Sequence, residues 1–388
     1  MYLVCEYIFW IALGAVAYSY AFYPLLLRLL ASGKKNNTVV YSENELPSVS
    51  ILIAAHNEES VIAEKLVSIF ESTYSLDKIE VLVGSDSSTD KTDSIVSELS
   101  KKYPGIKLVQ FNDRKGKVHI INRLAEIASN PIFIITDANV VFDKNTIKEL
   151  AKHFKNSSIA LVDSNMMHKG FKKDGISYEE SFYIRGEVSS KYNEGVLWGT
   201  MMGPFGGCYA IRKEYFFVVP EHFLVDDFYI NMKVLEKGGK AINEVHAVVY
   251  EDVSNELMEE FRRKIRIATG SFQNLFAFKY LLFRFNAISF CFFSHKVLRW
   301  LGPLFFFLIY ITSILLRFDP FFNYTLWAES IVILLVPLDY LLQKTGLHLR
   351  LLRLLRHFFF MNLAIFWGMM KAISGVKSSV WEPTRRYQ

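Results

Sequence analysis

The sequence predicts an α/β protein with a parallel, doubly wound sheet, flanked at both ends by membrane helices. Between residues 48 and 137, short apolar runs alternate with amphipathic segments, a pattern typical of successive β-α-β units. Residues 7–27 contain no charged side chain, and about 20 apolar residues suffice to cross the hydrocarbon core of a membrane. Apolar segments return after residue 276.

The N-terminal region, residues 1–32, is interpreted as a transmembrane anchor. Its apolar run is longer than the roughly 7–15 residues of a signal peptide, and an acidic rather than a basic residue precedes it. Lys34 and Lys35 follow the run. Because positive residues favour the cytoplasmic side, the next domain is expected in the cytoplasm. Residues 33–47 are polar and turn-rich, as in a linker.

Residues 48–275 are expected to form the cytoplasmic domain. Its first half contains strands and helices in regular alternation, and its second half, from about residue 155, is less regular. Strands are expected at 48–55, 79–85, 106–111 and in a run that ends at Asp137; helices are expected at 58–72, 90–102, 117–128, 225–239 and 256–272, and a short strand follows the glycines of 203–207.

Residues 276–388 are expected to form a C-terminal membrane region. Residues 300–316 are uncharged and long enough for a span, and residues 321–342 are expected to cross back despite Glu329 and Asp339, because a basic loop follows them. The apolar run 358–370 has only 13 uncharged residues. That length is more typical of an interfacial helix than of a span, which leaves the basic tail in the cytoplasm.

Composition excludes several classes of function. The cysteines Cys5, Cys208 and Cys291 are far apart and show no CxxC spacing, which argues against a disulfide framework and a zinc site. The net charge is +5, with much of the excess close to the apolar segments. This distribution suits a lipid bilayer better than a nucleic acid.

Polar residues follow three strands of the expected sheet. His56 and Glu58 follow the first strand, Asp86 ends the second and Asp137 ends the fourth. Taken alone, Asp137 is most simply a turn or cap residue. Because parallel strands bring their carboxyl ends to one edge, three such ends predict a site for a polar ligand, a cation, or both.

Two further polar residues near this edge have open interpretations. Asp90 is expected to cap the following helix, a structural role. Lys117 begins a helix directly after Gly116. It is either a solvated surface lysine or a contact for a phosphate group, since the start of a helix favours anions.

With these motifs, the chain resembles a membrane-bound family 2 glycosyltransferase with a GT-A-type nucleotide-sugar domain, of the polysaccharide-synthase-like branch. The similarity covers about residues 48–275, and its motifs stand in the family's order. They are ILIAAHNEE, LVGSDSSTDKT, RKGKVHIIN, TDANV, GPFGGCYAIR, LVDDFYINMKVLEKG, EEFRRKIRIATG and, in the tail, WEPTRR.

The resemblance implies a nucleotide-sugar donor, usually a uridine diphosphate sugar. His56 and Glu58 would flank the uridine, Asp86 would contact the base or ribose, and Lys117 would lie near the nucleotide. Asp137 matches the first acid of the family's metal-binding Asp-x-Asp motif and would hold Mg²⁺ or Mn²⁺ against the diphosphate. Asn139 replaces the second acid, which suggests a weaker metal site.

The same resemblance implies an inverting reaction. Asp227 matches the family's catalytic base, with Asp226 as its supporting neighbour; the alternative is that both only complement a helix dipole. Arg266 would contact the pyrophosphate. Arg263 and Ile267 replace a glutamine and a tryptophan of the family motif, which puts processive polymerisation in doubt.

Two further segments match parts of the family's substrate sites. Gly206, Gly207 and Cys208 match a turn that lines the acceptor pocket. Trp381, Thr384 and Arg385 resemble a segment that covers the bound nucleotide.

The expected protein is an inverting hexosyltransferase of the bacterial inner membrane that acts on a glycan or a lipid-linked acceptor in cell-surface polysaccharide synthesis. Partner synthase or export subunits are possible, because three spans are too few for a self-contained channel. One alternative is a transferase that loads polyprenyl phosphate with a single sugar. The other is a non-catalytic nucleotide-binding subunit.

Overall fold

The computed structural model describes residues 1–169, 177–252, 257–344 and 349–376. The chain forms two compact units. The sheet unit consists mainly of residues 27–254, with 285–291, and the helical unit of residues 1–26, 255–284 and 292–375. The expected domain boundary at residue 275 falls inside one helix, α9 (Leu257–Phe278).

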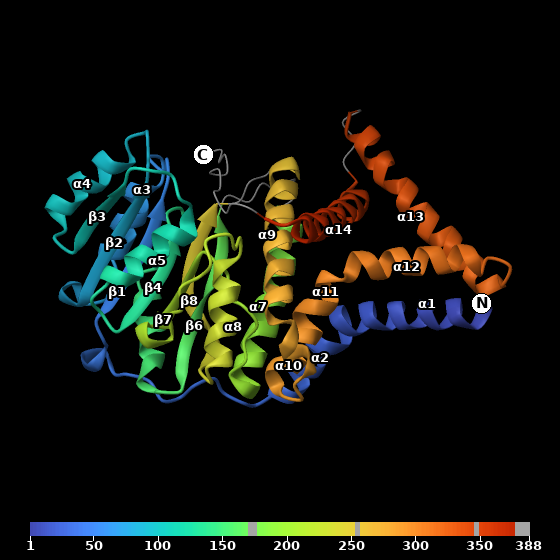
Figure 1. The fold of residues 1–388 in the computed structure, drawn as a ribbon, viewed down its shortest axis with the longest axis horizontal. Coiled ribbons are helices and arrows are strands. Elements are labelled where there is room, and N and C mark those ends of the chain that lie inside the picture. The colour runs from blue at the N-terminus through green and yellow to red at the C-terminus, as the bar shows by residue number, and fades with distance from the viewer. Residues whose placement is uncertain (170–176, 253–256, 345–348, 377–388) are drawn as a thin grey trace. The chain divides into compact units, whose positions relative to one another are not determined.

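The sheet unit is built on one mixed sheet, with eight strands in the described residues, in the order β3-β2-β1-β4-β7-β6-β8-β5 (Figure 1). The strands β3, β2, β1 and β4 are parallel, as the sequence predicts. Strand β7 is antiparallel to both of its neighbours, and β6 and β8 are parallel to each other. The bounds are β1 Val49–Ala55, β2 Ile79–Asp86, β3 Ile106–Phe111, β4 Ile132–Asp137, β5 Val141–Phe142, β6 Ile159–Lys169, β7 Cys208–Arg212 and β8 Lys240–Asp252.

Helices cover both faces of the parallel half. The odd-numbered residues of β1, such as Ile51 and Ile53, join a core with apolar residues of α3, α4 and α6. On the other face, α5 packs so closely on β2 that a Cβ at Gly84 would lie 2.3 Å from Ile120. The bounds are α3 Ile62–Phe70, α4 Thr92–Lys102, α5 Lys117–Ile127, α6 Thr146–Ala151, α7 Ser177–Trp198 and α8 Asp226–Glu236.

Three long elements lie in the region that the sequence pattern leaves irregular: β6, α7 and β8. Polar residues interrupt the apolar run of β6, and their side chains form hydrogen bonds with backbone carbonyls inside the fold. Ser164 donates a hydrogen bond to the carbonyl of Cys208 at 2.7 Å, and Asn165 donates one to the carbonyl of Val245 at 2.8 Å. Periodicity does not reveal a strand whose polar side chains are satisfied by distant segments.

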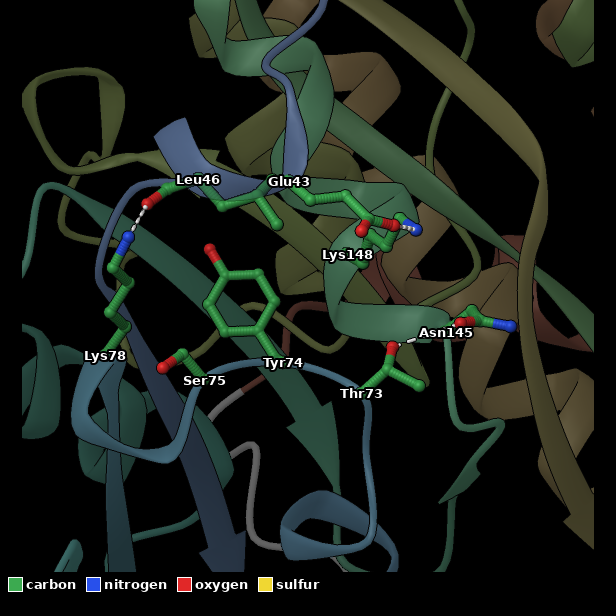
Figure 2. Close-up of a pocket in the computed structure, with 8 residues that line it drawn as sticks. All are labelled: Glu43, Leu46, Thr73, Tyr74, Ser75, Lys78, Asn145 and Lys148. Carbon is green, nitrogen blue, oxygen red and sulfur yellow. Dashed lines mark hydrogen bonds and ion pairs between the residues drawn. The ribbon is translucent and has the colours of Figure 1, made fainter.

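The linker expected at residues 33–47 is pinned to the amino edge of the sheet. A cavity of about 470 Å³ lies beside it. Figure 2 shows the residues that line this cavity: Glu43, Leu46, Thr73, Tyr74, Ser75, Lys78, Asn145 and Lys148. Lys78 donates a hydrogen bond to the carbonyl of Leu46 at 2.8 Å, and Tyr74 donates one to the carbonyl of Pro47. This cavity lies just before β1 and β2 begin, at the edge opposite the carboxyl ends of the strands.

Most of the apolar helices belong to the helical unit, whereas residues 27–31 and 287–291 belong to the sheet unit. Two described segments are long and apolar enough to cross a membrane, Tyr2–Ala31 and Pro320–Leu342, in agreement with two of the expected spans. The expected span at 300–316 is instead part of a helix pair bent by 59°, which would give a third span if it crosses as one. The bounds are α1 Tyr2–Ala17, α2 Tyr23–Ala31, α10 Ala287–Cys291, α11 Leu298–Trp300, α12 Gly302–Leu315, α13 Pro320–Lys344 and α14 Arg350–Ser374.

The acidic residue near the end of α13 has a buried partner. Asp339 is 1% exposed and forms a 3.0 Å ion pair with Arg356 of α14. A charge in an apolar helix is costly unless it is paired, so this contact explains how α13 carries an aspartate. Helix α14 is longer than the expected apolar run 358–370 and packs on α9, where a Cβ at Gly368 would lie 2.5 Å from Ala268.

Candidate active site

The carboxyl ends of β2, β1 and β4 lie side by side at one edge of the sheet, as the sequence predicts. In the register of these strands, Ala54 pairs with Gly84 on one side and with Asp137 on the other. The polar residues after these strands therefore converge at one rim. Open α/β sheets bind their ligands at this edge.

Asp86 fixes the start of α5. Its side chain is fully buried, and its two carboxylate oxygens accept hydrogen bonds from the backbone N–H groups of Lys115, at 2.7 Å, and Gly116, at 2.9 Å. Its carbonyl accepts a bond from Nδ1 of His56 at 2.7 Å. In this structure Asp86 thus positions the loop that carries Lys117, and its contact with a nucleotide stays a prediction.

The backbone after β1 and β2 adopts an unusual conformation that the sequence does not reveal. Asn57 and Ser87 have φ angles of 54° and 56°, in the left-handed region that non-glycine residues rarely occupy. The side-chain oxygen of Asn57 accepts the N–H of Thr89 at 2.8 Å, which ties the two loops together. Such backbone conformations concentrate at functional sites.

Asp90 has a structural role at the start of α4, although the N-cap position itself is occupied by Lys91. Its carboxylate accepts the N–H of Thr92, in the first turn of α4, at 3.0 Å, and the N–H of Glu59 at 3.0 Å. Glu58, next to this contact, is buried, with 8% of its surface exposed. Asp90 therefore holds the loop after β1 against the start of α4.

Lys117 lies among the carboxylates of the rim. Its Nζ is 2.7 Å from Oδ1 of Asp137, and both side chains are partly exposed, at 22% and 33%. Burial alone would lower the pKa of Lys117, but the charges of Asp137, Asp226 and Asp227 outweigh it and raise that pKa above its usual value. Lys117 is therefore a permanent cation at the end of β4.

Asp226 and Asp227 occupy the first turn of α8 and are both largely buried, at 6% and 9% exposure. Burial, and then the neighbouring charge of Asp226, raise the pKa of Asp227 from 3.8 to about 7, although Lys117 opposes this shift. A carboxylate with a pKa near neutrality is well suited to accept a proton at physiological pH.

The turn before β7 lies against Asp227. A Cβ added to Gly206 would be 3.2 Å from Oδ2 of Asp227, so the glycine lets the backbone approach the carboxylate. The carbonyl of Gly207 accepts the N–H of Asp137 at 3.0 Å. Cys208 is fully buried in the core. Of the three residues expected at the acceptor site, Cys208 could therefore contribute only its backbone.

A divalent cation would find one suitable carboxylate in this rim. Asp137 is partly exposed at the tip of β4. Asn139 is 9% exposed, and its amide nitrogen donates a hydrogen bond to the carboxylate of Glu251 at 3.0 Å. Within the described residues, no group of three or more His, Cys, Asp or Glu side chains is placed to hold a metal ion. These residues fit a Mg²⁺ or Mn²⁺ ion that takes few protein ligands and completes its shell with phosphate oxygens and water.

The remaining expected site residues do not belong to the described part of the sheet unit. Arg266 is on α9, which belongs to the helical unit, so its contact with a pyrophosphate stays a prediction. Trp381, Thr384 and Arg385 lie outside the described residues.

Residues 50–217 match the model of the Glycosyl transferase family 2. The match identifies these residues as a domain of this family. A probable glycosyltransferase, YdaM of Bacillus subtilis, is 36% identical over 125 residues, which are 31% of this chain and 29% of the relative. A β-monoglucosyldiacylglycerol synthase of Nostoc sp. is 28% identical over 149 residues, which are 38% of this chain and 30% of the relative.

The fold of the chain agrees with that of a solved glycosyltransferase. The mannosyltransferase PcManGT from Pyrobaculum calidifontis, determined in complex with GDP-mannose and Mn²⁺, superposes with a TM-score of 0.72 at 20% identity, covering 94% of this chain and 99% of that one. The expected GT-A fold is thereby confirmed. The alignments span less than a third of the two sequence relatives, so activity and substrates are treated as proposals.

Proposed function

We propose that the protein is an inverting glycosyltransferase that moves a sugar from a nucleotide-sugar to a glycan or lipid-linked acceptor. One observation carries the proposal: the cation Lys117 is held by Asp137 at the end of β4, and a buried carboxylate of raised pKa, Asp227, lies nearby at the start of α8. A diphosphate leaving group needs a cation to neutralise its charge, and an attacking hydroxyl needs a base to accept its proton.

The reaction is a single displacement. The oxygen of an acceptor hydroxyl attacks the anomeric carbon of the donor sugar, and the bond from that carbon to the diphosphate oxygen breaks. The hydroxyl proton passes to the carboxylate of Asp227, and the bonding electrons leave with the diphosphate. Because attack and departure are in line on opposite faces of the sugar, the configuration at the anomeric carbon inverts.

Charge develops on the leaving diphosphate as this bond breaks. Lys117 neutralises part of it, because its charge is held in the rim by Asp137 at 2.7 Å. A bound Mg²⁺ or Mn²⁺, held by Asp137 with Asn139 as a neutral neighbour, would supply Lewis-acid stabilisation of the same oxygens. The relative with a solved fold was determined with Mn²⁺, which supports a divalent ion here.

Two observations bear on the acceptor and the location. The Nostoc relative is named for glycosylation of diacylglycerol, and two helices in the described residues are long and apolar enough to cross a membrane. Both favour an acceptor presented at the cytoplasmic face of a bacterial inner membrane, with Lys34 and Lys35 on that side. Transfer of one sugar to polyprenyl phosphate is the second candidate.

The deciding experiment is a screen of nucleotide-sugars against purified membranes that contain the full chain, reading the nucleoside diphosphate released. We expect one donor to give release that depends on an endogenous acceptor. Radiolabel in a lipid phase, labile to mild acid, identifies polyprenyl phosphate; acid-stable lipid or polymer label identifies a glycolipid or a glycan. Nucleotide binding with no release from any donor would favour the non-catalytic subunit.

A further inference from the structure

A buried ion pair contacts the turn 205–207, which lies against Asp227. Lys191 of α7 and Asp163 of β6 are 1% and 0% exposed, and Nζ of Lys191 is 2.6 Å from Oδ2 of Asp163. Neither residue belongs to the motifs that identify the family in this sequence. Replacing a buried ion pair with apolar residues is often neutral or stabilising, so its presence calls for a reason other than stability.

The pair is connected to the backbone of the turn. The second carboxylate oxygen of Asp163, Oδ1, accepts the N–H of Phe205 at 3.1 Å. The ammonium of Lys191 lies 3.3 Å from the centre of the Phe205 ring. Asn243 of β8 donates to Oδ2 of Asp163 at 3.0 Å, which fixes the orientation of the carboxylate. Phe205 is thus held by both its backbone and its ring.

Phe205 directly precedes Gly206, the glycine that lies against the proposed base Asp227. Gly206 follows Phe205 and approaches Asp227 so closely that a Cβ would lie 3.2 Å from Oδ2. Beyond it, the carbonyl of Gly207 accepts bonds from the N–H of Asp137, at 3.0 Å, and the hydroxyl of Thr136, at 2.9 Å. The turn is therefore anchored on one side to Asp163 and on the other to the strand of Asp137.

The preceding loop is anchored in the same way. Glu194 of α7, which is fully buried, accepts the N–H of Met202 at 3.0 Å, and Asn231 of α8 donates to the carbonyl of Met201 at 3.0 Å. Buried polar side chains from β6, α7 and α8 hold the loop, so its position does not depend on solvent-exposed contacts.

We propose that Asp163 and Lys191 are positioning residues that fix the turn 205–207 against Asp227 so that a sugar or lipid hydroxyl, rather than water, is presented to this base. This inference rests on the proposed transferase function and adds a determinant of its acceptor specificity. A displacement of about 1 Å in an aligned site can cost about 100-fold in rate, so a loosened turn would weaken acceptor use and admit water to the donor.

Two double variants distinguish a role of Asp163 and Lys191 in positioning the turn from a role in the stability of the protein. Asp163→Asn with Lys191→Met removes both charges but keeps an oxygen that can accept the Phe205 N–H. Asp163→Val with Lys191→Met removes both charges and that oxygen. If the valine variant does not fold, Asp163→Ala in the same background replaces it. The control is Glu80→Gln, which alters a buried carboxylate whose partners, Lys107 at 2.9 Å and Ser129 at 3.0 Å, are remote from the turn.

Each variant is measured in three ways, as the full chain in detergent. Hydrogen–deuterium exchange reports on residues 201–209. Kinetics give the KM for the acceptor and the fraction of donor transferred to water, and nucleotide affinity serves as a reference. We expect the valine variant to exchange faster in the turn, to raise the acceptor KM about 10- to 100-fold and to hydrolyse more donor, with nucleotide affinity unchanged. The asparagine variant and Glu80→Gln should stay close to wild type.

The proposal would be overturned if the two double variants had the same KM for the acceptor and hydrolysed the same fraction of donor. It would also be overturned if the turn exchanged hydrogen faster in the valine variant while the kinetics stayed unchanged. Failure of the proposed function is distinguishable, because the wild-type chain itself would then release no diphosphate from any donor. In that case hydrogen–deuterium exchange still tests whether Asp163 holds the turn. Equal exchange at residues 201–209 in the two double variants would refute positioning of the turn by the Asp163 oxygen.

Discussion

Nζ of Lys117 lies 2.7 Å from Oδ1 of Asp137. This contact joins the first turn of α5 to the tip of β4, and it places a positive charge where three carboxylates of the rim act on it. The cation does more than satisfy Asp137, because it also lowers the pKa of Asp227 against the effect of burial. One lysine therefore influences both the leaving-group side and the base side of the proposed reaction.

Lys117→Met tests this double role. Loss of the charge should weaken nucleotide diphosphate binding by about 10-fold or more, since a charge-assisted hydrogen bond contributes roughly 1.5–3 kcal/mol. It should also raise the pKa of Asp227 and shift the acid limb of the pH–rate profile to higher pH. Isothermal titration with nucleotide and kcat/KM against pH measure the two effects. The control Lys101→Met, at an exposed position on α4, should change neither; a variant with wild-type affinity and profile would contradict both roles.

How far the sequence predicts this arrangement depends on where each residue finds its partners. Strands β1, β2 and β4 are evident as apolar runs because nearly all of their residues are buried, whereas β3 lies at the edge of the sheet and is only partly buried. Asp137 and Asp86 are predicted at one edge because parallel strands must end together. Asp163 and Lys191 are 28 positions apart and belong to no motif quoted above. Their pairing, like the polar interior of β6, follows only from tertiary packing, which no local pattern encodes.

Removal of the proposed base gives a direct test of the chemistry. Asp227→Asn should lower transfer by about 10²–10⁴-fold, the usual cost of losing a general base, because the amide cannot accept the hydroxyl proton. Nucleotide affinity should be retained, since Lys117 and Asp137 are unchanged. Release of diphosphate and nucleotide titration are the two measurements. A variant that transfers sugar at the wild-type rate would rule out this role for Asp227.

The raised pKa of Asp227 also makes stability depend on pH. The carboxyl binds its proton more tightly in the folded chain, with a pKa of about 7, than in the unfolded chain, where the usual pKa of an aspartate is 3.8. Its contribution to stability is therefore complete below about pH 4 and is lost as the pH rises through 7. Asp227→Asn resembles the protonated form, so it should be more stable than wild type at pH 8 by several degrees in Tm and equal to it near pH 4. Thermal unfolding at the two pH values measures this, and equal Tm at pH 8 would contradict the shift.

Activity should show the opposite dependence, because the base works only when it is deprotonated. We expect kcat/KM for transfer to rise with pH and to level off above about 7, following the pKa of Asp227. The measurement is the pH profile of diphosphate release in the presence of acceptor. A profile that is flat from pH 5 to 8 would show that no group of this pKa controls the reaction.

Metal binding should depend on nucleotide, because Asp137 is partly exposed at the rim and the described residues form no group of three or more metal-binding side chains. We expect weak binding of Mn²⁺ to the chain alone and at least about 10-fold tighter binding with a nucleoside diphosphate, whose oxygens complete the coordination shell. Paramagnetic resonance of free Mn²⁺ measures both affinities, and Asp137→Asn should reduce the nucleotide-dependent gain. Tight binding without nucleotide would indicate a protein-only site, and transfer that survives a chelator would exclude a metal requirement.

The closeness of Gly206 to Asp227 predicts a substitution that blocks the base without removing it. In Gly206→Ala the new methyl group would lie 3.2 Å from Oδ2 of Asp227, so either the carboxylate or the turn must shift. Such a displacement should lower kcat for transfer by about 10- to 100-fold and leave nucleotide affinity close to wild type. The matched control is Gly186→Ala on α7, where a Cβ meets nothing within 4 Å and alanine favours the helix. Because the control adds the same methyl group away from the rim, equal kcat values for the two variants would show that the approach of this turn to Asp227 has no part in the reaction.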